Sequence, residues 1–308
     1  MKKISIFVFV LLVYAQAAAA FTIATGSKEG TYYKIAQDIK RVAKKEGLDL
    51  KVITSNGSFE NIKLLGQGKA DLAIVQKDAL GYFADFIKET DKSDVFDQIK
   101  IVLNLYPEEV HVITNNKDLA SFRDLQNKRV AVGSRNSGTL LTSDYLFQAY
   151  KLKAKTYDFG PTRAVDELRK GNIDAMIFVG GAPVAAFKTL DKEFRYVRLP
   201  QDDRLDKIYQ RKILERDFYK WAKTDTATYA INSVIVARNR NNQDYIVNLQ
   251  RLVLAILKNK ESLESNGHPK WKKSLIRYFY RDVGFGPTND IIKIYNLLTE
   301  YGYKIVKK

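Results

Sequence analysis

Hydrophobic residues along the chain alternate between short continuous runs and a helical spacing of three and four. In residues 31–46, for example, Ile35, Ile39 and Val42 share one face of a helix and polar residues the other. The runs predict strands at residues 21–25, 48–54, 71–76, 99–106, 108–115, 128–134, 154–159, 173–179, 194–199 and 226–238. The helical spacings predict helices at residues 31–46, 58–68, 78–88, 137–151, 162–170, 203–220, 242–261, 270–281 and 288–303. This alternation is typical of an α/β fold.

An internal repeat divides the pattern into two similar halves. The stretch GSFENIKLLGQGKADLAIV from Gly57 matches GPTRAVDELRKGNIDAMIF from Gly160, with Gly, Leu, Gly and Asp at equal offsets. Upstream, ATGSKEGT from Ala24 resembles AVGSRNSGT from Ala131, with one residue inserted. Two matches in the same order indicate a duplicated lobe of strand, Gly-Ser loop, helix, strand, turn, helix and strand.

Two such lobes predict a bilobed binding fold, in which a ligand lies between the lobes and hinge closure traps it. The strand-rich segments 107–114 and 226–236 are the expected crossings between lobes. The first lobe is then predicted at residues 21–110 plus 229–308, and the second, inserted lobe at residues 111–228.

Residues 1–20 differ in character from the rest of the chain. Lys2 and Lys3 precede the apolar run 4–14, and Ala-rich residues follow at 15–20. This pattern predicts a secretory signal peptide and a periplasmic location. The alternative is an N-terminal membrane anchor, for which the apolar run is short. The absence of cysteine excludes disulfides, thiol chemistry and a lipid anchor on Cys.

The chain is strongly basic, with 51 Lys and Arg against 35 Asp and Glu and a formal net charge of +16. Such a balance is compatible with a nucleic acid, an acidic membrane surface or an anionic ligand. The basic residues are spread along the chain without an aromatic-basic module, so we expect no nucleic-acid partner. An ordinary basic surface with a mild bias towards small anions is the favoured interpretation, and we expect a monomer.

The stretch ATGSKEGTYY, residues 24–33, follows a predicted strand and precedes a predicted helix. Free backbone N–H groups and the helix dipole favour an anion at such a junction. Gly30 is followed by Thr31 and Tyr32, so neither the phosphate-binding loop nor the Gly-x-Gly-x-x-Gly motif is present. We predict ligand contacts at Thr31, Tyr32 and Tyr33. The alternatives are a plain turn with Thr31 as N-cap, and an exchange of core and cleft roles between the tyrosines.

Four further segments end strands at the same predicted edge, where ligands bind in open α/β sheets. The candidate ligand contacts in them are Gly57, Ser58, Gln76, Asp78, Ser134, Arg135, Ser137, Gly138, Thr139 and Gly180. Gln76 ends an apolar run, which favours a functional role. Asp78 also suits a helix N-cap, as Ser58 does, and Arg135 is either a carboxylate clamp or a solvated surface residue.

The residues needed for catalysis are scarce. His111 and His268 are the two histidines, with no zinc-binding pair, and no Gly-x-Ser-x-Gly elbow occurs. His111 lies on a predicted crossing strand, where a structural role is favoured, and His268 in a surface loop. Glu108 and Glu109 are adjacent on a strand and face opposite sides, which argues against paired-carboxylate hydrolysis. We therefore predict no catalytic residue, no metal and no cofactor.

Together, the runs ATGSKEGTYYKIAQDI, SNGSFENIKLLGQGKADLAIVQKDAL, VAVGSRNSGT and LRKGNIDAMIFVGGAP resemble the TAXI family of TRAP-transporter solute receptors. The likeness spans most of residues 21–190, is weak at 200–240 and resumes at His268. It implies a type II periplasmic binding fold and a ligand such as glutamate or 2-oxoglutarate. It also implies a membrane TRAP permease, driven by an ion gradient, as partner. The family's ligand-contacting loops correspond to Thr31, Tyr32, Tyr33, Gly57, Ser58, Gln76, Asp78, Ser137, Gly138 and Thr139.

The prediction from sequence is therefore a non-enzymatic periplasmic receptor for a small organic anion. The alternatives are a receptor for an ATP-driven (ABC) importer or a sensor kinase, an exported enzyme on the same scaffold, and an exported protein that binds polyanions.

Overall fold

The computed structural model describes residues 20–88, 98–216, 218–238, 240, 242–275, 278–280 and 304–306. Except for Ala20, the predicted signal peptide lies outside these residues, and so does the predicted helix at 288–303. In the described part of the chain, no helix combines the length and apolar character needed to cross a membrane.

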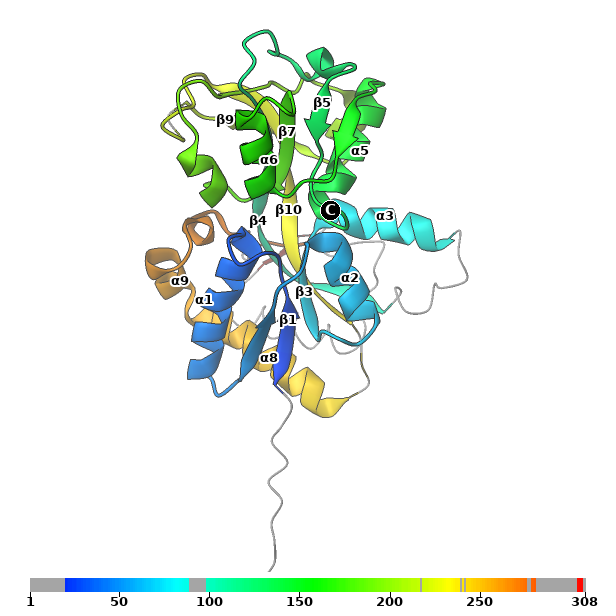
Figure 1. Ribbon diagram of the computed structural model, residues 1–308. Helices are drawn as coiled ribbons and strands as arrows, with labels where there is room; N and C mark the ends of the chain where they lie inside the picture. Colours follow the sequence, from blue (N-terminus) through cyan, green and yellow to red (C-terminus); the bar gives the residue numbers. More distant parts are fainter. Residues whose placement is uncertain are drawn as a thin grey trace, which may run out of the picture.

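The chain forms a ten-stranded mixed sheet with helices on its faces (Figure 1). Its strands are β1 Phe21–Ala24, β2 Leu50–Ile53, β3 Leu72–Gln76, β4 Ile99–Thr114, β5 Arg129–Ala131, β6 Lys155–Tyr157, β7 Ala175–Gly180, β8 Arg195–Tyr196, β9 Gln210–Leu214 and β10 Thr226–Arg238. The helices are α1 Thr31–Lys45, α2 Ser58–Gly66, α3 Lys77–Lys88, α5 Gly138–Tyr150, α6 Pro161–Arg169, α7 Asp203–Asp206, α8 Gln243–Lys258 and α9 Lys260–Asn266. Short 3₁₀ segments are η1 Phe122–Leu125, η2 Ala185–Thr189 and η3 Pro269–Lys273.

The repeat seen in the sequence corresponds to two units of the same topology. In lobe I, built on β1, β2 and β3, the strands are parallel in the order β2-β1-β3. In lobe II, built on β5, β6 and β7, they are parallel in the order β6-β5-β7. The repeated aspartates have the same role: Asp71 Oδ2 accepts the Thr22 N–H of β1 at 2.8 Å, and Asp174 Oδ2 accepts the Arg129 N–H of β5 at 2.7 Å. The matching residues therefore mark matching strand pairs.

Two long antiparallel strands, β4 and β10, connect the lobes (Figure 1). In lobe I, β10 pairs with β3, and in lobe II it pairs with β9. β4 pairs with β10 over most of its length and with β7 at its lobe II end. The paired strands β4 and β10 therefore extend from one lobe into the other, with register shifts along their ladder.

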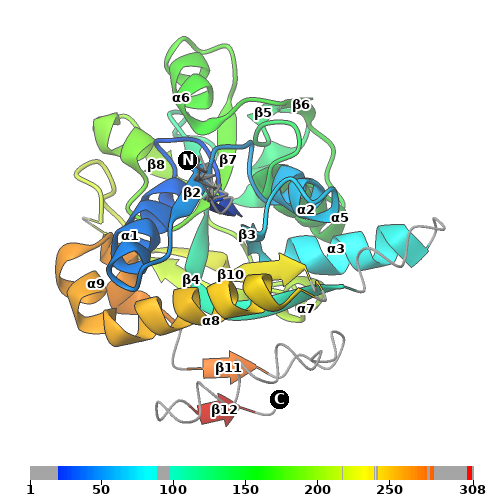
Figure 2. The ribbon, with the colours of Figure 1, turned by 90° about the horizontal axis from the view of Figure 1, so that it is seen from below.

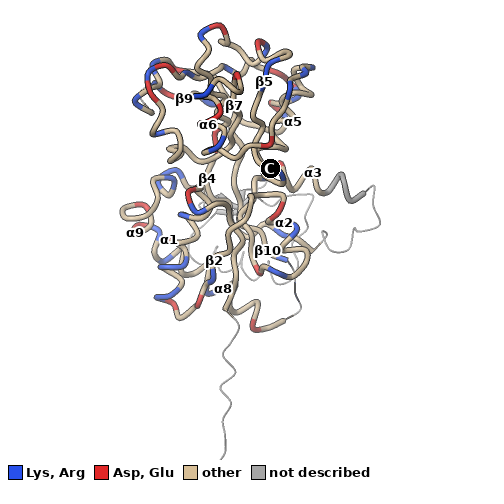
Figure 3. The backbone as a smooth tube through the Cα atoms, viewed as in Figure 1, with Lys and Arg blue, Asp and Glu red and all other residues tan. Residues whose placement is uncertain are grey.

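The hydrophobic core is divided in the same way. Two clusters draw on residues 21–106 and 234–271, with Leu141 and Tyr145 of α5 as the exceptions, and two others draw on residues 110–231. The predicted face of α1 is fully buried, and burial of each Ile or Val side chain contributes about 1.5–3 kcal/mol. In the view of Figure 3, acidic and basic residues are interspersed over both lobes.

Two strands predicted on either side of Pro107 are one strand, β4, and that prediction was wrong. Pro107 has no N–H to donate, which usually excludes it from a central strand. Here it lies opposite Asn232, and the pairing with β10 shifts register between Asn232 and Val234. The irregularity lets the strand continue past the proline.

The helices predicted at 203–220 and 270–281 were also wrong. The first is the short α7 followed by β9, which pairs along the free edge of β10. The charged residues of β9 are exposed, and Leu214 is the one buried residue of that strand. Pairing with β10 therefore decides the structure of this segment, although its spacing of charges is compatible with a helix. The second is η3 followed by β11, Tyr278–Tyr280, which pairs in parallel with β12, Lys304–Val306 (Figure 2).

Candidate functional site

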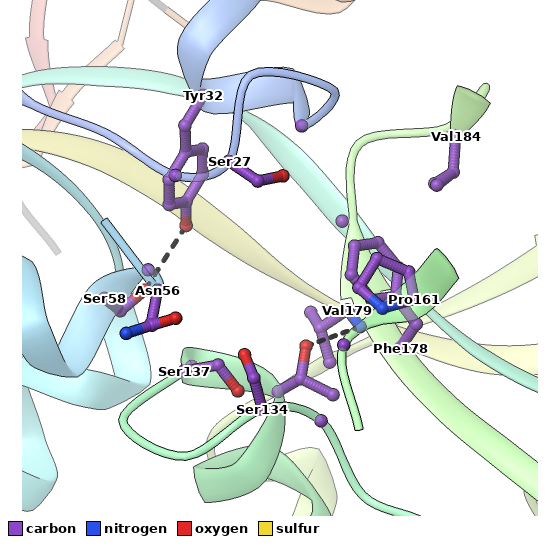
Figure 4. Close-up of a pocket in the computed structure, with 18 of the residues that line it drawn as sticks. Ser27, Tyr32, Asn56, Ser58, Ser134, Ser137, Pro161, Phe178, Val179 and Val184 are labelled. Atoms are coloured by element: carbon purple, nitrogen blue, oxygen red, sulfur yellow. Dashed lines mark hydrogen bonds between the residues drawn. The ribbon is translucent and has the colours of Figure 1, made fainter. Parts of the chain in front are cut away.

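A cavity of about 330 Å³ lies between the lobes, within the usual size range of small-ligand pockets. Residues from both lobes line it, and most come from loops that lead into helices (Figure 4). The lining comprises residues 26–27, 29–30, 32, 55–58, 76, 108, 133–134, 137–139, 160–163, 178–180, 184 and 186. The first turns of α1, α2, α5 and α6 therefore face one cavity, and N–H groups in a first turn have no partner within their own helix.

Tyr32 of α1 reaches into the cavity from lobe I (Figure 4). Its hydroxyl donates to Glu108 Oε2 at 2.6 Å and lies 3.4 Å from Ser58 Oγ. Burial raises the pKa of this hydroxyl well above its ordinary value, and the neighbouring Glu108 adds to the shift. Tyr32 therefore stays a neutral hydrogen-bond donor.

The loop 55–58 brings backbone and hydroxyl groups to the cavity. Gly57 has a φ of +118°, a conformation that favours glycine, and it is the N-cap of α2. The prediction that Ser58 is the N-cap was therefore wrong. Ser58 lies one residue later, and its Oγ accepts the Gln76 N–H at 3.0 Å, which leaves the hydroxyl proton for another acceptor.

The first turn of α5 lies against lobe I. A Cβ atom added to Gly138 would lie 1.6 Å from Gln76 Oε1 and 2.7 Å from Ser58 Oγ. The Glu60 N–H also donates to the Asn136 carbonyl at 3.2 Å. The two lobes are thus in direct contact beside the cavity, and a side chain at position 138 would displace the Gln76 amide from its present place.

Ser137 and Thr139 orient this turn. Ser137 Oγ caps α5 by accepting the Leu140 N–H at 3.1 Å. Thr139 Oγ1 accepts the Val179 N–H of β7 at 3.1 Å (Figure 4). Both hydroxyls are fixed by backbone donors and keep their own protons, so each can donate to an oxygen atom in the cavity.

The sequence interpretation missed several of the residues that line the cavity, and Glu108 is the buried acidic residue among them. It lies on β4, is 2% exposed and lines the cavity. Burial raises its pKa to about 8, against the opposing effects of the Tyr32 hydrogen bond and the Lys270 charge. Glu109 does face the other way, as predicted, and its carboxylate binds Lys270 Nζ at 2.6 and 2.8 Å. The sequence did contain one signal for a role of Glu108, which is a glutamate within an otherwise apolar strand that crosses between the lobes.

Most of the predicted site residues lie together around the cavity. These are Tyr32, Gly57, Ser58, Gln76, Ser134, Ser137, Gly138, Thr139 and Gly180. Ligand contact by each of them remains a prediction.

Four predicted residues do not line the cavity. Thr31 Oγ1 donates to the Gly181 carbonyl at 3.0 Å, so it joins α1 to lobe II, and Gly30 rather than Thr31 is the N-cap. Tyr33 follows Tyr32 in α1 and is partly exposed. Arg135 is exposed, and its Nε forms an ion pair with Asp158 Oδ2 at 3.5 Å.

Asp78, the fourth, is buried between the lobes. Its Oδ2 accepts the Thr142 and Tyr209 hydroxyls, both at 2.9 Å, while its Oδ1 accepts the Ala79 N–H. Burial raises its pKa to about 6.

The two histidines are placed away from the cavity. His111 is fully buried beside Phe187, Tyr196 and Tyr219, and burial lowers its pKa to about 4. His268 Nδ1 accepts the Lys270 N–H in the turn before η3, and burial lowers its pKa to about 4 as well. Within the described ranges, no group of three or more His, Asp or Glu side chains is arranged to hold a metal ion.

The model of the NMT1-like family matches residues 23–276, and the chain belongs to that family. Among solved structures, it is similar to an ancestral arginine-binding protein bound to arginine, with 15% identity, a TM-score of 0.50, and coverage of 82% of this chain and 95% of the other. Another is the GluR0 ligand-binding core from Nostoc punctiforme in complex with L-glutamate, with 16% identity, a TM-score of 0.49 and coverage of 80% and 98%. A third is an amino acid ABC transporter substrate-binding protein from Streptococcus pneumoniae bound to L-arginine, with 17% identity, a TM-score of 0.49 and coverage of 82% and 95%. The chain has the predicted bilobed type II periplasmic binding fold.

Proposed function

We propose that this member of the NMT1-like family is an extracytoplasmic solute receptor that captures a small organic anion and delivers it to a TRAP-type secondary transporter. The ligand class comprises dicarboxylates, 2-oxo acids and acidic amino acids such as glutamate. The observation that carries the proposal is the convergence of four helix N-termini on one cavity between the lobes.

The cavity has two sources of positive potential, the helix N-termini and Arg163 of α6, which is the basic residue among those that line it. Each helix N-terminus carries about half a positive charge from aligned peptide dipoles, and its free N–H groups point at the space ahead of it. The hydroxyls of Ser27, Ser134 and Ser137 surround the same space (Figure 4). Such neutral donors suit a carboxylate, because they can donate several hydrogen bonds to its two oxygens.

Capture would couple to closure of the two lobes. The contacts of Gly138 with Gln76 and of Glu60 with Asn136 cross between lobes at the cavity edge. Bending of β4 and β10 would open that edge and expose the helix N-termini to solvent. We place lobe I at residues 21–110 plus 229–308 and lobe II at residues 111–228. The core clusters change within a few residues of these boundaries, since Val110, Tyr229 and Ile231 pack in a lobe II cluster.

Delivery to a TRAP permease rests on the resemblance of the sequence to the TAXI receptors, and export to the periplasm rests on residues 1–20. Neighbouring genes for the two TRAP membrane subunits would support this partner, whereas neighbouring genes for an ATPase and its permease would support an ABC importer. N-terminal sequencing of the exported protein would show cleavage after Ala17 or Ala20, or an uncleaved anchor.

A thermal-shift panel tests ligand capture. Succinate, glutarate, 2-oxoglutarate, L-aspartate and L-glutamate would be added to the purified mature chain, with neutral diols of similar size as controls. A ligand at 100 times its Kd stabilises the folded state by about 2.7 kcal/mol, so at least one acid should raise the Tm by several degrees. Absence of stabilisation by every acid at millimolar concentration would contradict the proposed ligand class.

A further inference from the structure

Two acidic residues line the cavity, and they differ in environment. Glu29 is exposed, whereas Glu108 is 2% exposed. Glu108 Oε2 accepts the Tyr32 hydroxyl at 2.6 Å, and among the described residues no other side chain or backbone group donates to the Glu108 carboxyl. One carboxyl oxygen is therefore left without a donor in a cavity that is otherwise suited to a ligand's carboxylate.

The charges around Glu108 do not compensate a carboxylate. The titratable groups that face it are Tyr32 of α1, Asp78 of α3, Tyr106 and Glu109 of β4, and Lys270 of η3. Lys270 is the one cation among them, and its Nζ is bound by both oxygens of Glu109. Asp78 and Glu109 add further negative charge. Arg163 of α6 also lines the cavity, but its guanidinium lies 4.0 Å from the centre of the Phe159 ring and, among the described residues, forms no ion pair with Glu108. A carboxylate at Glu108 therefore has no cation of its own.

We propose that Glu108, oriented by Tyr32, is a subsite for the protonated amino group of the ligand, which is therefore a zwitterionic α-amino acid. The inference rests on the proposed function and narrows its ligand class. The ammonium group would donate to the free Glu108 oxygen, and the carboxylate would lie at the N-termini of α2 and α5. The Glu108 subsite and the first turn of α5 are close together. Tyr32 Oη lies 3.4 Å from Ser58 Oγ, and Ser58 Oγ lies 2.7 Å from the position that a Cβ atom would take at Gly138.

The raised pKa of Glu108, about 8, agrees with this role. In the empty cavity at pH 7 the carboxyl is mostly protonated, which avoids an uncompensated buried charge. An arriving ammonium group lowers the pKa of Glu108 and the carboxyl loses its proton to solvent. A 2-oxo acid or dicarboxylate presents an oxygen instead, and would leave Glu108 protonated as a hydrogen-bond donor.

The test compares ligands that differ only in the substituent on the carbon next to one carboxylate, which is an amino group, an oxo group or hydrogen. L-Glutamate, glutarate and 2-oxoglutarate share one carbon skeleton, and L-aspartate and succinate form a second set. Isothermal titration at pH 7 in phosphate and in Tris, which differ in ionisation enthalpy, measures affinity and proton release together. We expect the amino acid to bind about 10- to 100-fold more tightly than its deaminated partner and to release roughly one proton.

Two variants make the assignment specific. Glu108→Gln keeps the acceptor for Tyr32 and the volume of the side chain, so it should fold, as circular dichroism would check. It should remove the preference for the amino acid and the proton release, and leave glutarate binding within about threefold. The matched control is Glu193→Gln, which makes the same change at an exposed glutamate that does not line the cavity and should alter neither quantity.

Each outcome separates this inference from the proposed function. Equal or tighter binding of glutarate and 2-oxoglutarate, or an amino-acid preference that persists in Glu108→Gln, overturns the ammonium subsite and leaves an anion receptor. If none of the acids binds, the anion receptor itself is overturned, and the subsite with it.

Discussion

The Thr142 hydroxyl of α5 donates a hydrogen bond to Asp78 Oδ2 of α3 at 2.9 Å, so a buried carboxyl of lobe I is held by lobe II. The Tyr209 hydroxyl, also in lobe II, donates to the same oxygen at 2.9 Å. The two bonds lie beside the cavity and can form only when the lobes are together. Under the proposed function, these bonds would connect ligand capture with closure of the lobes.

Loss of the Thr142 hydroxyl should weaken closure. In Thr142→Val, Asp78 would lose one of its two interlobe donors, which costs about 1–2 kcal/mol and lowers ligand affinity by about 5- to 30-fold. The matched control is Ser143→Ala. That neighbouring hydroxyl bonds to Val132 within lobe II, so its loss should not affect affinity specifically. Isothermal titration calorimetry measures the ligand affinity of both variants. If Thr142→Val binds the ligand as tightly as the wild type, the bond between Thr142 and Asp78 does not contribute to closure.

Closure should also be sensitive to volume at Gly138. In Gly138→Ala, the new Cβ would overlap Gln76 Oε1 in the closed form, whereas an open form has room for it. We expect at least a tenfold loss of affinity and a larger radius of gyration by small-angle scattering in the presence of ligand. Gly81→Ala adds the same methyl group to α3, where nothing lies within 4 Å, and should leave both measurements unchanged.

Glu108 should make stability depend on pH. Because its folded pKa is raised from an ordinary 4.5 to about 8, the folded state binds the proton more tightly, and the free energy of unfolding falls as pH rises towards 8. Between pH 6.5 and 8 the two histidines oppose this loss, because an unfolded histidine still releases its proton near pH 6.5 whereas the folded pKa of His111 and of His268 is about 4. Asp78, with a folded pKa of about 6, adds a small further loss. Over that window the net loss should be about 1 kcal/mol in the ligand-free chain.

Urea unfolding at several pH values measures this loss. Glu108→Gln should remove the fall and leave a slight rise in stability from pH 6.5 to 8, because the two buried histidines then dominate the profile. Glu193→Gln, at an exposed acidic residue, should keep the wild-type slope. A wild-type profile that is flat or rises from pH 6.5 to 8 would show that Glu108 is ionised in the empty cavity.

Lys270 should be important for stability rather than for binding. Its side chain is 1% exposed, and its Nζ donates to Glu109 Oε1 at 2.6 Å and to the Pro107 carbonyl at 2.8 Å. Glu109 in turn accepts the Ala182 N–H at 3.0 Å. Lys270→Met leaves Glu109 without a cation and should cost about 3–5 kcal/mol, measured by urea unfolding. The double variant Lys270→Met with Glu109→Gln should recover part of this loss, and a single variant as stable as wild type would contradict the account.

The periodicity of the sequence was sufficient to predict the lobes and most of their elements. The paired residues Asp71 and Asp174 occupy equivalent positions, immediately before β3 and β7, and each accepts a backbone N–H of the neighbouring strand β1 or β5. This equivalence is why the repeat could be found from sequence. The 203–220 segment was mistaken for a helix because its charge pattern does not reveal that β10 offers a free edge. Pro107 was interpreted as a break because the compensating irregularity lies on another strand.

The candidate site was predictable where it depends on loops that follow strands, since chain order alone places those loops at one edge. Glu108 escaped notice because the interpretation weighed it only as a partner of Glu109 in catalysis. Its environment is created by Tyr32, which is distant in sequence. The burial of Asp78 likewise depends on Tyr209 and Thr142 of the other lobe. The residues next to Asp78 in the sequence give no sign of these two partners.

The central claim, capture of a small organic anion between the lobes, is tested most directly by a crystal structure of the mature chain with the acid that stabilises it most. The account predicts density for that acid in the cavity, with a carboxylate at the first turn of α5 near Ser137 and Thr139. An empty cavity, or the same acid bound only outside it, would contradict the claim.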